Sequence, residues 1–273
     1  MSLRRKFYLW TTKFSLTKRQ LFVLATTVLT FILLLTQMVS SDYRYAFVFF
    51  LALCTYFFSA FCLREDLRGV EWMTLLILPT LYSAAVALFY FLLPVRWLTR
   101  IPVAFLYAIG LYALLLTENI FNVAANRTIA LLRAAHSVGF LMTFATFFLL
   151  VQITLAFRFG PVVNTLVTSV ISFLCILQAL WVMELEPKIS RRVWVLSLAL
   201  TLVMAEVSWV LSFWPSQPMM VALFTASILY SLVGIAQQYV VDKMYKKTVI
   251  EFFVVCAIVF IIFMVTTNWR GTL

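Results

Sequence analysis

Glu206 stands alone among apolar residues in the stretch LALTLVMAEVSWVLSFWP. This apolar run centres near residue 203, so a membrane-spanning helix would place the carboxyl close to the middle of a bilayer. A charged side chain at that depth costs about 2.5–3.5 kcal/mol on insertion scales, so Glu206 is expected to be neutral or paired. Two roles stay open, a carboxyl that couples proton movement or binds substrate, and a protonated carboxyl that joins helices by hydrogen bonds.

Other apolar runs contain polar residues at a depth similar to that of Glu206. Arg158 lies at the outer boundary of one run and is long enough to reach inward. The predicted intramembrane polar site consists of Glu206, Gln152, Asn164, Arg158 and Tyr230, with Thr168 and Ser227 as further neighbours by depth.

A second polar region is TENIFNVAANRTIALLRAAHS, residues 117–137, which contains the only histidine. On a helical projection its polar residues gather on one side, which predicts an amphipathic helix over 118–137 on the cytoplasmic side. Either this helix lies flat with its polar stripe in water, or it continues into the next span and lines a cavity. The polar stripe consists of Glu118, Asn119, Asn122, Asn126, Arg133 and His136.

Residue patterns typical of catalysis are missing from the sequence. The one histidine has no acidic pair at metal-ligand spacing, so we expect no metal site. Phosphate-binding loops, dinucleotide-binding glycine patterns, HExxH and GxSxG are also absent, so we expect no cofactor and identify no catalytic residue. Four cysteines fall within apolar runs and are expected to pack as small hydrophobic side chains.

The elements that must position these residues follow from composition. Hydrophobic residues make up 64% and charged residues 11% of the 273 residues, against roughly 45–50% and 25% in soluble domains. The apolar residues fall in runs of about 18–26, the length needed to cross a bilayer. We therefore predict an all-α transmembrane helix bundle, a single domain over 20–269 that follows a basic amphipathic segment, 1–19. The nine predicted spans are 20–39, 44–63, 71–93, 101–117, 138–157, 161–183, 193–214, 218–239 and 249–268.

Lysine and arginine predict the orientation of this bundle. With the N-terminus in the cytoplasm, nine alternating spans place sixteen of the 21 basic residues inside and five outside, and the C-terminus outside. The net charge of +11 then reflects topology and contact with anionic lipid headgroups, and no nucleic acid partner is expected. We expect the protein to lie in a bacterial cytoplasmic (inner) membrane.

Three classes of function stay open. The sequence favours a non-catalytic subunit, scaffold or sensor that acts through helix and lipid contacts, with protein partners or further copies of itself. A small-solute or lipid transporter (a flippase) would use Glu206, but Gly and Pro, which interrupt helices in many transporters, are rare within the spans. A membrane-embedded enzyme on a lipid-linked substrate would need convergent charges, and the outer segments offer Asp42, Arg44, Arg96, Arg100 and Arg158.

Overall fold

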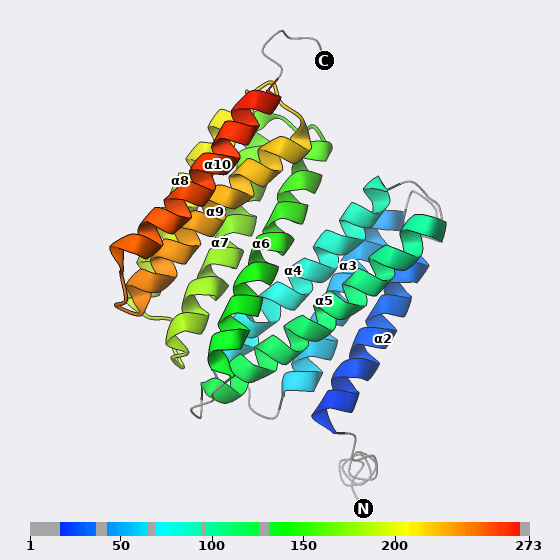
Figure 1. Cartoon of the computed structure of the whole chain (residues 1–273). Coiled ribbons are helices and arrows are strands. Elements are labelled where there is room, and N and C mark those ends of the chain that lie inside the picture. Colours follow the sequence, from blue (N-terminus) through cyan, green and yellow to red (C-terminus); the bar gives the residue numbers. More distant parts are fainter. Residues whose placement is uncertain (1–16, 37–42, 65–68, 94–96, 126–130, 268–273) are drawn as a thin grey trace, which may run out of the picture.

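The computed structural model describes residues 17–36, 43–64, 69–93, 97–125 and 131–267, which form nine α-helices and no strand (Figure 1). Each of the nine is long and apolar enough to cross a membrane, which confirms the predicted all-α bundle of nine spans. The helices are α2 (Lys18–Thr36), α3 (Arg44–Leu63), α4 (Glu71–Leu92), α5 (Trp97–Ala124), α6 (Leu132–Ala156), α7 (Pro161–Glu184), α8 (Arg191–Leu211), α9 (Pro218–Val240) and α10 (Lys246–Thr266). The predicted segment 1–19 lies outside the described residues except for its last three.

The helix ends follow local sequence signals. Pro161 and Pro218 occupy the first turns of α7 and α9, where the missing amide hydrogen of proline costs no hydrogen bond. Ser190 precedes α8, and its side chain accepts a hydrogen bond of 3.1 Å from the backbone nitrogen of Val193. Inside the helices, hydroxyl groups bond to carbonyls of their own helix, as Thr26 does to Phe22 at 2.7 Å.

Consecutive helices run antiparallel and form two groups (Figure 1). The first helix group comprises α2 to α5, and the second helix group comprises α6 to α10. Helices α4 and α5 pack against α6, and α4 also contacts α7, so these four helices form the boundary between the groups. The start of α2 and the end of α10 lie at opposite ends of the bundle.

Burial differs strongly among the helices. Helix α7 buries twelve of its residues, including Trp181, whereas α8 buries five and α10 buries only Phe263. Gly234 of α9 lets α10 pack closely, because a Cβ at this position would overlap the ring of Phe252. Helices α8 and α10 therefore lie at the outside, with most of their side chains facing the surroundings of the bundle.

Candidate functional site

A buried carboxyl near the end of α5 contacts a glutamine of α7. Glu118 is fully buried, and its Oε1 accepts a hydrogen bond of 2.7 Å from Nε2 of Gln178, which is 2% exposed. Among the described residues, no cationic side chain forms an ion pair with Glu118. The contact joins the first helix group to the second by a hydrogen bond between two buried polar side chains.

Further polar side chains fix the helix ends around Glu118. Asn122, one turn later in α5, donates from Nδ2 to the carbonyl of Leu63 at the end of α3, at 3.0 Å. His136 of α6 donates from Nε2 to the carbonyl of Val182 in α7, at 2.9 Å, because a carbonyl can only accept. The imidazole also stacks on the ring of Phe121, with centroids 5.4 Å apart. The α5-end cluster, defined as Glu118, Asn122, His136 and Gln178, thus ties α3, α5, α6 and α7 together.

A small cavity adjoins this cluster. Its volume is about 10 Å³, at the lower limit for one water molecule. Gln237 of α9 lies at its wall and donates from Nε2 to the carbonyl of Ala179, at 2.9 Å. The polar lining consists of His136, Thr143, Gln178 and Gln237. This cavity leaves no room for a substrate larger than water.

The single helix predicted over 118–137 is wrong. Helix α5 continues to Ala124 and α6 begins at Leu132, so the polar stripe is divided between two helices that face each other. Hydropathy ended the fourth span too early because it counts Glu118 and Asn122 as polar. Partners on α7 and α3 bond to these side chains inside the bundle.

The members of the polar stripe have different surroundings. Glu118 and Asn122 face inward, whereas Arg133 is exposed at the start of α6. Asn119 and His136 are half-buried, and Asn126 lies outside the described residues. Of the two alternatives, one had the stripe continue into the fifth span and face inward. Glu118 and Asn122 do face inward, but they lie on α5, which is the fourth span.

Gln178 and Gln237 belong to this region and were not predicted. Gln178 is a lone amide in an apolar run, Gln237 is followed by Gln238 near the end of another, and an amide at membrane depth tends to face other helices. That signal marks polar residues inside a bundle but does not pair Gln178 with Glu118, 60 residues away.

The structure places Glu206 on the outside. Its side chain is exposed on α8, and it forms no hydrogen bond or ion pair with any described residue. Helix α8 packs against α7 and α9 through its opposite side, which carries Val193, Ser197, Met204, Ser208 and Leu211. The predicted polar site around Glu206 is therefore not assembled.

The other predicted members of that site lie elsewhere. Gln152 is half-buried in α6, and Asn164 of α7 donates from Nδ2 to the carbonyl of Phe159, at 3.1 Å. Arg158 is exposed in the turn between α6 and α7. Tyr230 of α9 packs against aromatic rings of α6 and α10, namely Phe140, Phe144 and Phe252. Hydropathy gave the depth of these residues but not the direction in which each side of a helix faces.

The exposed side of α8 has a regular spacing. One line of residues on this side, the last of them in the turn after α8, recurs at intervals of four, three, four, three and four, and Trp194, Leu198, Val203 and Val210 beside it are also exposed. Two of the aromatic side chains, Trp209 and Phe213, contact each other edge to face. We call this side the α8 outer stripe: Val195, Ala199, Leu202, Glu206, Trp209 and Phe213, all exposed.

A charged pair joins α8 to the turn after α9. Arg192 donates to Oδ1 of Asp242 at 2.9 Å and to the carbonyl of Tyr239 at 2.6 Å. The hydrogen bond from Arg192 holds the pKa of Asp242 below its usual value. Asp242 has a positive φ of 56°, which places it in the left-handed region that short polar residues tolerate. The pair connects the start of α8 to the end of α9, and it was not predicted from the sequence.

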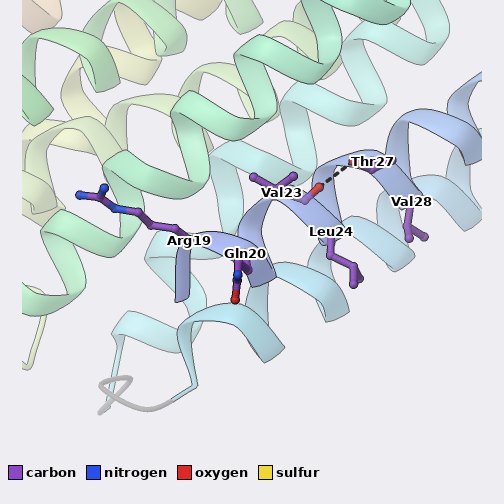
Figure 2. Close-up of a pocket in the computed structure, with 6 residues that line it drawn as sticks. All are labelled: Arg19, Gln20, Val23, Leu24, Thr27 and Val28. Carbon is purple, nitrogen blue, oxygen red and sulfur yellow. Dashed lines mark hydrogen bonds between the residues drawn. The ribbon is translucent and has the colours of Figure 1, made fainter. Parts of the chain in front are cut away.

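The larger hollows are open grooves on the outer surface. One of about 470 Å³ runs along α2, with Arg19 and Gln20 at one end and Val28 at the other (Figure 2). Thr27, one of its lining residues, donates its hydroxyl to the carbonyl of Val23 in the same helix, at 2.8 Å. Another groove, of about 210 Å³, lies between α3, α4 and α7 and is apolar except for Tyr56 and Thr80. Their linings suit lipid chains more than a polar substrate.

Comparisons with known proteins add a family relationship. A family model described as "Protein of unknown function (DUF5656)" matches residues 59–266. No curated protein and no solved structure matches the chain. The matched region begins within α3 and ends with α10, so it includes both Glu118 and Glu206.

Proposed function

The chain belongs to the DUF5656 family of proteins of unknown function, and we propose that it is a non-catalytic membrane subunit or scaffold. In this proposal the α8 outer stripe binds a transmembrane helix of another protein. The supporting observation is Glu206, an exposed carboxyl on a lipid-facing helix that has no partner among the described residues.

The position of Glu206 along α8 makes contact with lipid costly. Helix α8 has 21 residues, or about 31 Å, and Glu206 lies five residues, or about 7.5 Å, before its last residue. Helical side chains lean toward the N-terminus, so this carboxyl is directed toward the helix middle and away from the nearer end. A polar group held there is stabilised when another helix offers it a hydrogen bond.

The chemistry of the stripe favours a partner with a hydrogen-bond donor. Glu206 is an acceptor when ionised, and the α8 outer stripe carries no lysine, arginine or amide side chain, so the indole N–H of Trp209 is the one donor that the stripe of a second copy would offer it. A partner helix with Lys, Arg, Asn or Gln at the matching depth would complement it. Ala199 leaves space for close approach, and Trp209 and Phe213 supply contact area.

The surroundings of Glu206 do not favour transport. Glu206 lines neither the cavity beside His136 nor the grooves along α2 and between α3, α4 and α7. A transporter that used this carboxyl would need a path from it into the bundle, whereas the side chain faces outward. Convergent charges that would support an enzyme on lipid-linked substrates are likewise not found beside it among the described residues.

We infer the same orientation from charge as from the sequence, with the start of α2 in the cytoplasm of a bacterial cell. Of the thirteen Lys and Arg in the described residues, ten lie at the end of the bundle where α2 starts. Three lie at the other end, namely Arg44, Arg100 and Arg158. Cysteines introduced at Asn126 and Gln217 should react with impermeant reagents from opposite sides of the membrane, and labelling from one side would contradict this topology.

The proposed binding can be tested by site-specific photo-crosslinking in the native cell. A photoreactive residue replaces Leu202 on the α8 outer stripe, and the matched control replaces Ile258 on the exposed side of α10. We expect a crosslinked protein of one mass at Leu202 and only lipid adducts at Ile258. Glu206→Gln should keep the adduct, because an amide still bonds, whereas Glu206→Leu should reduce it about three- to eighteen-fold. That range corresponds to an interhelical hydrogen bond of about 0.6–1.7 kcal/mol.

The identity of the captured protein decides the outcome. Its crosslinked segment should be transmembrane and contain a donor side chain whose replacement by Leu also removes the adduct. A product of twice the mass of this chain would mean that a second copy occupies the stripe, contrary to the proposal. Equal lipid labelling at Leu202 and Ile258, with no protein adduct, would also contradict it.

A further inference from the structure

Two buried oxygens in the contact between Glu118 and Gln178 have no hydrogen-bond donor among the described residues. They are Oε2 of the carboxyl and Oε1 of the amide, on two side chains already joined by the bond from Nε2 to Oε1. An ionised carboxylate has only acceptors, so neither orphan oxygen can satisfy the other. An unmet polar atom at full burial carries a desolvation penalty that folded proteins rarely retain.

A single proton on Glu118 would give both oxygens a hydrogen-bond partner. If Oε2 of Glu118 carries a hydrogen, it becomes a donor, and Oε1 of Gln178 is the acceptor on the facing head group. Acid and amide then form two hydrogen bonds side by side: the amide nitrogen donates to Oε1 of Glu118, and the acid hydroxyl donates to Oε1 of Gln178. We propose that Glu118 and Gln178 form a buried proton-binding site, in which the neutral acid fastens α5 to α7.

The charged groups near this end of the bundle do not neutralise Glu118. His136 of α6 directs its Nε2 hydrogen to Val182, and Glu118 forms no ion pair with a described residue. The other acidic and basic residues described at this end are Lys18, Arg19, Arg64, Glu71, Arg133, Glu184, Glu186, Lys188, Arg191, Arg192, Asp242, Lys243, Lys246, Lys247 and Glu251. A buried carboxylate without a counter-charge is expected to take up a proton, because desolvation of the charge costs far more than protonation.

Infrared spectroscopy of the full-length protein in lipid nanodiscs tests the site. At neutral pH, we expect a carboxylic-acid C=O band in the wild type that Glu118→Gln removes. Glu206→Gln is the matched control and should keep that band. Gln178→Leu should move the band to higher frequency, because the acid loses its amide partner. Glu118→Gln should fold, since two amides also pair in both directions.

The same variants can overturn the proposal. If no carboxylic-acid band depends on Glu118, or if Gln178→Leu leaves the band unchanged, the acid and amide do not share a proton in this way. A bound monovalent cation would show a different pattern. Exchange of sodium for choline would then lower the unfolding temperature of the wild type but not of Glu118→Gln, whereas a proton site predicts no change in either.

Discussion

Glu118 and Glu206 are two carboxyls within long, mainly apolar helices, and their surroundings in the bundle are opposite. Glu118 is fully buried against Gln178, whereas Glu206 is exposed and has no partner among the described residues. A carboxyl within an apolar helix therefore does not by itself indicate one role. The difference comes from the helix that carries it, since that helix decides whether a second polar group is within reach.

The two helices have different neighbours. Helix α5 packs against α2, α3, α4 and α6, and Gln178 of α7 reaches Glu118 from the second helix group. Helix α8 contacts α7 and α9 on one side only. A carboxyl on α5 is thus stabilised within the chain, whereas one on α8 depends on lipid or another protein.

The largest effect is expected for insertion of α8 into a membrane. Glu206→Leu should favour insertion of the α8 segment by on the order of 2–3 kcal/mol, because a carboxyl in the apolar layer is replaced by a residue that prefers it. Glycosylation-based insertion assays on the segment measure this shift. Glu118→Leu in an α5 segment should behave similarly, since the isolated segment lacks Gln178. An unchanged insertion of α8 would mean that Glu206 lies at the membrane surface.

In the whole protein, replacing the two carboxyls should change the free energy of unfolding by different amounts. Glu118→Leu should lower the free energy of unfolding by about 1–3 kcal/mol, because it leaves the buried amide of Gln178 without an acceptor. Glu206→Leu should not lower it in the isolated protein, because no described residue loses a bond. Denaturant titration in detergent micelles measures both. Equal losses of unfolding free energy for the two variants would contradict the expectation that only Glu118 is stabilised within the chain.

The number of helices was predictable because length and hydropathy suffice to recognise a span. Seven of the nine predicted ranges need only small changes at their ends, whereas the fourth and fifth were cut short on either side of 117–137. The fourth range ended early because a sequence window counts Glu118 and Asn122 as polar, although a buried polar side chain costs little once another helix bonds to it. The fifth range began late because the first turns of α6 contain Arg133 and His136, of which Arg133 is exposed and His136 bonds to α7.

The candidate sites were less predictable than the helices. Glu206 was recognised as unusual from its depth, but its partners were chosen by depth alone. The rotation of a helix about its axis depends on packing, which a single apolar sequence does not encode strongly when nearly every side chain is hydrophobic. Gln178 was missed for the same reason, because no periodicity in α7 indicates which neighbour it faces.

A smaller effect is expected at the start of α6, where the half-buried His136 and the exposed Arg133 lie within one turn. His136→Phe keeps a ring to stack on Phe121 but loses the hydrogen bond to Val182. The free energy of unfolding should therefore fall by about 0.5–1.5 kcal/mol. Arg133→Ala, at an exposed position three residues earlier, is the matched control and should change stability by less. Thermal unfolding of both variants provides the test, and a larger loss for Arg133→Ala would mean that the imidazole is not held as described.

The smallest effect is expected for Asp242, a carboxyl that is exposed and paired. The hydrogen bond from Arg192 holds the pKa of Asp242 below its usual value, so the carboxylate is stabilised in the folded state. This contribution is complete above the ordinary pKa of aspartate, about 3.9, and is lost as the pH falls through the lower folded value. Asp242→Asn should therefore lower the unfolding temperature slightly at pH 7, and the difference from the wild type should shrink at acidic pH and at high salt. Thermal scans of the two proteins across pH provide the measurement. A difference that grows as the pH falls would contradict the sign of this linkage, and one as large as that for Glu118→Leu would show that exposure does not weaken the pair as expected.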